Sequence, residues 1–151
     1  PLTSIRMGEK APAIFLFMLG LLTLVPGAIH VFLPDGGAGV IAGLDLSAHG
    51  AMIVSVFAWA GATQMAWGAL MMWVALFHRA LLVLVLTLAL LERVVMALNE
   101  WWLKPGDIGA TVGGDRPPGV YGTLVAIPLI AFFLVWAWRL RSRKQSLAAG
   151  S

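Results

Sequence analysis

Two ionisable residues stand side by side within a long apolar run, where each charge needs a partner. Glu92 and Arg93 occupy the segment 80–98, about seven residues before its end, or ~10 Å along a helix. On insertion scales an acidic side chain near the bilayer centre costs about 2.5–3.5 kcal/mol. Helix neighbours point about 100° apart, so these two side chains cannot share one face. Each is expected to find its partner on another part of the chain.

Other polar residues fall in the same half of the chain's apolar segments. Histidines end the first segment and begin the second, and Gln64 lies deeper in the second. The sequence predicts an outward-facing polar pocket that binds a ligand. Its candidate residues are His30, His49, Gln64, Glu92, Arg93, Asn99, Glu100 and Tyr121. Two other interpretations stay open: these groups lock the helices together by pairing, or they form a proton or ion path.

Metal binding and catalysis have less support. His30 and His49 could hold a divalent ion with Glu92 or Glu100, but no HxxxH or ExxH spacing accompanies them. The absence of Cys excludes disulfides and thiolate chemistry. Gly36-Gly37-Ala38-Gly39 lacks the spacing of a nucleotide-binding loop. We therefore expect no catalytic residue, no metal and no obligatory cofactor, although a quinone or a lipid is a conceivable ligand.

The elements that position these residues are four apolar segments, at about 11–32, 50–77, 80–98 and 119–138. The chain is 60% hydrophobic and 11% charged, so lipid must be its solvent. Each segment has roughly the 20 residues needed to cross a bilayer as a helix. The first segment could be a signal peptide, but its length favours retention. The sequence predicts an all-α, antiparallel four-helix transmembrane bundle over residues 1–144, followed by a disordered tail at 145–151.

Basic residues predict the orientation of the bundle. Most fall at one end of a four-span bundle: Arg6, Lys10, Arg79, Arg139, Arg141, Arg143 and Lys144. The positive-inside rule then places both termini in the cytoplasm, and the protein in a bacterial inner membrane. This distribution also argues against nucleic-acid binding, despite a net charge of +3.

Local signals predict further details. Asp45 or Ser47 is expected to cap the second helix, and a glycine- and proline-rich connector spans 104–118. Pro26 and Pro128 are expected to bend their helices. The tryptophans at 59, 67 and 73 are expected to be packing or lipid-facing rings. Small residues in the second helix predict close helix contact, within the chain or with another subunit: Gly61, Ala62, Ala66, Gly68 and Ala69.

Several short motifs resemble those of small DoxX-like bacterial membrane proteins and their uncharacterised relatives. They are Gly-Ala-Ile-His at 27–30, Leu-Pro-Asp at 33–35, Gly-Leu-Asp at 43–45, the glycine-rich stretch 61–69, and Arg93. The resemblance implies a four-helix fold without a settled activity. Some such proteins are associated with quinones or redox partners, which makes a quinone-like ligand conceivable. This chain lacks the Cys of some redox members, so no thiol-based role is implied.

These observations favour a non-catalytic membrane protein. The first hypothesis is a subunit or assembly factor, in a homo-oligomer or with other transmembrane subunits. The second is a binder of a lipid-like or quinone-like molecule in the outward-facing pocket. The third is a small proton-coupled transporter, which the lack of inverted repeats disfavours. Membrane lipid is an expected partner under all three.

Overall fold

All the regular elements among the described residues are helical. The computed structural model describes residues 2–104 and 116–149, with helices α1 (Leu2–Phe32), α2 (Gly50–Phe77), α3 (Leu82–Leu98) and α4 (Pro118–Ala149). A 3₁₀ turn (Arg79–Leu81) precedes α3 and a π-helical turn (Asn99–Leu103) follows it. In this described part, four helical stretches are long and apolar enough to cross a membrane: Lys10–Phe32, Gly50–Phe77, Arg79–Leu103 and Pro118–Leu147. Helices pair most of their backbone groups internally, which suits segments that cross lipid.

The terminal helices are longer than predicted. α1 begins at Leu2 and α4 continues to Ala149, so residues 145–149 are helical where the sequence predicted a disordered tail. Hydroxyls on the last turns bond back to the helix: Ser146 Oγ donates to the Ser142 carbonyl at 3.0 Å. Both helices continue through their internal prolines, and the predicted bends stay a prediction. Most of the predicted connector 104–118 lies outside the described residues.

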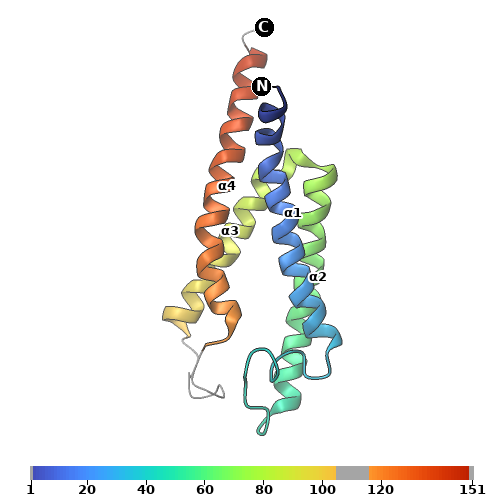
Figure 1. Cartoon of the computed structure of the whole chain (residues 1–151). Coiled ribbons are helices and arrows are strands. Elements are labelled where there is room, and N and C mark those ends of the chain that lie inside the picture. Colours follow the sequence, from blue (N-terminus) through green and yellow to red (C-terminus); the bar gives the residue numbers. More distant parts are fainter. Residues whose placement is uncertain (1, 105–115, 150–151) are drawn as a thin grey trace.

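The helices form two antiparallel pairs, α1 with α2 and α3 with α4 (Figure 1). Both termini lie at one end of the bundle, which we call the basic end. The pairs meet near this end and diverge toward the other, which we call the loop end (Figure 1). The buried core lies in the half nearer the basic end and includes Leu16, Met71, Leu86 and Ile130. Contacts between the two pairs are sparse compared with those within each pair.

Glycines bring α1 and α2 into backbone contact. A Cβ on Gly20 would lie 2.7 Å from the Gly68 carbonyl oxygen, and one on Gly27 would lie 2.8 Å from that of Gly61. The two contacts are spaced seven residues apart on each helix, so they recur every two turns. Small residues permit such close approach between membrane helices. The predicted close contact of Gly61 and Gly68 is therefore made within the chain.

The loop between α1 and α2 is held by Asp35. Its carboxylate accepts hydrogen bonds from the backbone amides of Val40 (2.8 Å), Gly37 (2.9 Å) and Gly39 (3.2 Å). These bonds, that of Val40 first, hold the pKa of Asp35 below its ordinary value. Gly36 and Gly37 have positive φ angles, of 61° and 73°, which suit glycine. The amide nest thus fixes the chain as it leaves α1.

The predicted cap of α2 is wrong. Its N-cap residue is His49, at φ 60°, and no side-chain capping bond is made there. Asp45 instead accepts a 2.8 Å hydrogen bond from the Ser47 amide two residues on. This local Asx turn occupies the carboxylate before the helix begins.

Candidate functional site

Glu92 and Arg93 lie farther from the end of their helical stretch than the sequence predicted. The 3₁₀ and π-helical turns extend the third span to Arg79–Leu103, so Glu92 is near its midpoint. Roughly 16 Å of helix separates Glu92 from Leu103, instead of the ~10 Å expected. At this depth a lone carboxylate is costly, and its partners decide how the third span packs.

Glu92 is partnered by an indole on α2. Trp67 Nε1 donates a 3.0 Å hydrogen bond to Glu92 Oε2. The Glu92 side chain remains 34% exposed, compared with 18% for Arg93. A carboxylate can accept about four hydrogen bonds, so one indole leaves acceptor capacity unused.

Arg93 turns toward α1. Its Nη2 donates to Thr23 Oγ1 at 3.3 Å, and Thr23 in turn donates to the Leu19 carbonyl at 2.9 Å. Arg93 Nε also lies 3.9 Å from Glu92 Oε2, which is an ion-pair distance but too long for a hydrogen bond. Each residue therefore has a hydrogen-bond partner on another part of the chain, Trp67 for Glu92 and Thr23 for Arg93. One polar network, made of Trp67, Glu92, Arg93 and Thr23, thus joins α2, α3 and α1.

A groove of about 730 Å³ opens beside this network, between α2 and α3. Its walls are mainly apolar, with Trp59, Trp67 and Leu70 among them. Its polar lining comes from Thr63, Gln64 and Glu92. Gln64 Oε1 is buried there without a hydrogen-bond partner among the described residues. A buried amide oxygen without a partner loses the hydrogen bonds it makes in water, so its position here is energetically costly.

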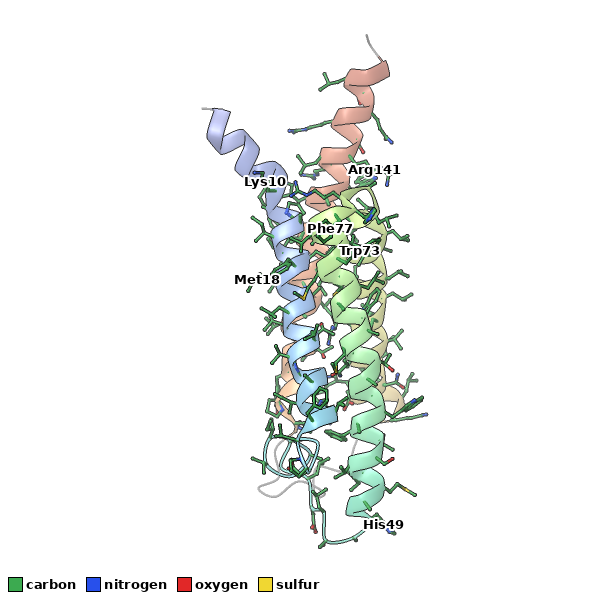
Figure 2. The ribbon with its side chains drawn as sticks, turned by 90° about the vertical axis from the view of Figure 1, so that its right-hand side faces the viewer. Lys10, Met18, His49, Trp73, Phe77 and Arg141 are labelled. Atoms are coloured by element: carbon green, nitrogen blue, oxygen red, sulfur yellow. The ribbon has the colours of Figure 1, made fainter. Side chains whose placement is uncertain are left out.

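Six of the eight predicted pocket residues do not line this groove, and of these only Arg93 belongs to the polar network beside it. His30 Nδ1 donates to the Gly36 carbonyl at 2.6 Å, and its ring packs edge-on against Phe57 with centroids 5.0 Å apart. It therefore anchors the loop after α1. His49 is exposed at the loop end of α2, at the opposite end of the helix from Trp73 and Phe77 (Figure 2). Neither histidine faces Glu92.

The other three lie near the loop end of the second pair. Asn99 Nδ2 donates to the Val95 carbonyl of its own helix at 3.1 Å. Glu100 accepts at its backbone oxygen a 2.9 Å hydrogen bond from Arg116, whose guanidinium lies 4.5 Å from the centroid of the Trp101 ring. Tyr121 is 49% exposed on α4. Residues at similar depth were expected to converge, but the helix pairs diverge toward this end and separate them.

Two residues of the polar network were missed by sequence reasoning. Trp67 was expected only to pack or face lipid, and Thr23 was not singled out. The residue type could have suggested each role. An indole N–H in a lipid-spanning helix needs a hydrogen-bond acceptor, and a threonine hydroxyl on a neighbouring helix can accept a hydrogen bond from a guanidinium. Which helix faces which residue was the missing information.

The two ends of the bundle differ in charge. Lys10 and Arg141 lie near the basic end, with Phe77 and Trp73, whereas His49 lies at the loop end (Figure 2). Arg79 follows α2 at the same basic end, and Arg139 and Arg143 lie on the last turns of α4. Near the loop end, Asp35 and Asp45 are in the loop before α2, and Glu100 follows α3.

The fold and the groove place this chain in a class of helical proteins. It has four helical stretches able to cross a membrane, and a polar network joins these helices. No protein-family model matches the chain, and no curated protein or solved structure is detectably similar to it. The DoxX-like relationship therefore stays an expectation. No group of three or more His, Asp or Glu side chains able to hold a metal lies within the described residues.

Proposed function

We propose that this protein binds a lipid-like or quinone-like amphiphile in the groove between α2 and α3. The observation that carries the proposal is the buried, unpartnered Gln64 Oε1, which shares an apolar groove with the partly exposed carboxylate of Glu92. Polar atoms of this kind inside a lipid-spanning bundle favour a guest that completes their hydrogen bonds.

The size and walls of the groove support an amphiphile. Small-molecule sites are typically about 300–1,000 Å³ and mostly apolar, with few polar groups, and this groove has about 730 Å³. Trp59 is 77% exposed and lies on the outer surface of α2. In a bilayer that surface faces lipid, so the guest would reach the groove sideways from the membrane.

The charges around the groove favour an uncharged head group that donates hydrogen bonds. Glu92 and Gln64 both offer acceptor oxygens. Arg93, 3.9 Å from Glu92, already balances the carboxylate, so a cation is not required. A hydroxyl fits this environment, as in a hydroxylated lipid or the reduced, quinol form of a quinone.

The charge distribution supports an inner-membrane location with both termini in the cytoplasm. Helix α1 begins and helix α4 ends at the basic end (Figure 1). In a chain with four spans, Lys10, Arg79, Arg139, Arg141 and Arg143 all fall at this end. Such an excess of Lys and Arg favours the cytoplasmic side. A DoxX-like relationship remains part of this proposal.

Mass spectrometry of the protein released from mild detergent tests ligand binding, with chemical identification of retained small molecules. Ala66 lines the groove, whereas Ala62, also exposed on α2, does not. We expect Ala66→Leu to displace the guest and Ala62→Leu to retain it. Thr63→Val and Thr87→Val form a second matched pair, because both hydroxyls bond to their own helix but only Thr63 lines the groove. Equal retention by the members of both pairs contradicts the proposal.

A membrane subunit or assembly factor is the second candidate. The observation that favours it is a face of α2 with small exposed residues at heptad spacing: Ser55, Ala62 and Ala69. Since Gly61 and Gly68 pack on α1, these residues are free to meet another transmembrane helix. Crosslinking through a Cys at position 62 should then capture a second subunit in the membrane, while a Cys at position 88 on α3 should not.

A further inference from the structure

A second groove, of about 720 Å³, runs along one face of α4 near the basic end. Phe132, Trp136, Arg139 and Arg143 line it, at positions i, i+4, i+7 and i+11 of one helix. This spacing keeps them on one face. The groove is therefore apolar along its length and cationic where it approaches the end of α4.

The cationic end consists of two exposed guanidinium groups one turn apart. Among the described side chains, neither Arg139 nor Arg143 has a carboxylate within ion-pair distance. A guanidinium presents a fork of N–H donors that matches phosphate oxygens. Two such forks on one helix face can hold one phosphate between them.

The apolar part is held in place by ring contacts. Phe133 stacks on Phe15 of α1, with centroids 4.2 Å apart, and on Trp136, at 5.8 Å. Trp136 also meets Phe132 edge-on at 5.6 Å. The groove residues run from Ala131 to Arg143, roughly 18 Å of helix. One leaflet of hydrocarbon is about 15 Å thick, so the groove has the length of a lipid chain with its head group.

We propose that this face of α4 binds one anionic phospholipid, with its phosphate on Arg139 and Arg143 and an acyl chain along Phe132, Val135 and Trp136. The site lies on a different helix from the groove between α2 and α3 and does not depend on the function proposed for that groove. The kind of ligand follows from two features together. The guanidinium groups of Arg139 and Arg143 match a phosphate, and the apolar groove residues next to them match an acyl chain.

Arg141 provides a matched control. It has the same charge and is also exposed near the end of α4, but it lies about 200° around the helix from both groove arginines and does not line the groove. If basic residues only attract an anionic membrane in general, replacing any of the three arginines should weaken lipid binding equally. If the groove is a specific site, replacing Arg139 or Arg143 should weaken binding more than replacing Arg141.

The test is native mass spectrometry of the full chain titrated with phosphatidylglycerol or phosphatidylcholine in mild detergent. Wild type should retain phosphatidylglycerol preferentially. The double variant Arg139→Gln/Arg143→Gln should bind it roughly thirty-fold more weakly, and Phe132→Ala should bind it several-fold more weakly with both charges intact. Arg141→Gln should bind like wild type. Circular dichroism of each variant confirms that its helices are retained.

Two results would overturn this site. Equal weakening by Arg141→Gln and Arg139→Gln would show diffuse attraction only. Equal retention of phosphatidylcholine and phosphatidylglycerol by wild type would show that the arginines do not select the head group. Ala66→Leu, which fills the other groove, should leave phosphatidylglycerol retention unchanged, so the two proposals fail separately.

Discussion

The indole nitrogen of Trp67 on α2 lies 3.0 Å from the Glu92 carboxylate on α3, near the middle of the third span. Through Arg93 and Thr23 the same network reaches α1. The network borders the buried core, against which Trp67 also packs. It therefore holds the third span against the first pair and also shapes the groove beside it.

Replacing Trp67 by Phe keeps a ring but removes the donor to Glu92. We expect unfolding in mixed micelles to become easier by about 0.6–1.7 kcal/mol, the range for polar contacts between membrane helices. Trp73→Phe is the control, because the Trp73 ring packs on His78 at 4.0 Å and makes no described hydrogen bond. Equal losses in the two variants would mean that ring size matters and the hydrogen bond does not.

The hydroxyl of Thr23 is expected to matter more than its methyl group. Thr23→Val conserves shape but leaves Arg93 Nη2 without its oxygen acceptor, so it should lower stability by roughly 1 kcal/mol. Thr23→Ser retains the hydroxyl and should lose less. Denaturation with increasing SDS measures both; a larger loss in the Ser variant would argue against the hydrogen bond.

Alanine at the glycine contacts should separate α1 from α2. A Cβ on Gly27 or Gly61 would lie 2.8 Å or 2.6 Å from the opposing backbone oxygen. Gly27→Ala and Gly61→Ala should each destabilise by about 1–3 kcal/mol, measured by thermal unfolding. Gly122→Ala on α4 meets nothing within 4 Å and should be neutral or stabilising, because Ala is the better helix former. Destabilisation by Gly122→Ala of the same size would remove the steric explanation.

The Asp35 nest should be insensitive to pH over the physiological range. Because the folded loop lowers the pKa of Asp35 from its ordinary value of 3.8, its stabilisation is fully present above that value. It is lost as the pH falls through the still lower pKa of the folded state. Amide exchange protection of Val40, Gly37 and Gly39 should therefore be constant from about pH 5 to 8. Asp35→Ala should abolish that protection, whereas Asp45→Ala should affect only the Ser47 turn.

Single cysteines should report the proposed topology cleanly, because the chain contains none. Ala48→Cys, in the loop before α2, should react with an impermeant maleimide on intact cells. Ser146→Cys, near the end of α4, should react only after the cytoplasmic side is opened. Leu88→Cys on α3 should stay unlabelled from either side. Labelling of position 146 by the impermeant reagent on intact cells would contradict the proposed cytoplasmic location of the end of α4.

The sequence alone was sufficient for the helical class and for the number of apolar spans in the described chain. Mean composition and segment length decide both, since lipid demands that each backbone group be paired within its own helix. It was also sufficient to predict that Glu92 and Arg93 would each find a partner on another part of the chain, because 100° per residue is a local property.

Local sequence was less reliable at the ends of elements. The turns flanking α3 extend the third span, so Glu92 lies near its middle. Asp45 was expected to cap α2, but a turn two residues on competes for the same carboxylate. Element ends are set by competing local hydrogen bonds, which sequence preference alone does not rank.

Only the tertiary structure decided which polar residues meet. His30, Asn99 and Tyr121 have the depth of a shared site, but His30 holds a loop, Asn99 bonds to its own helix and Tyr121 is exposed. Trp67 and Thr23 became partners of Glu92 and Arg93 because the packing of the helices brings them within hydrogen-bond distance of α3. Hydropathy along a chain encodes depth in lipid, whereas the direction in which each side chain points depends on contacts between distant segments.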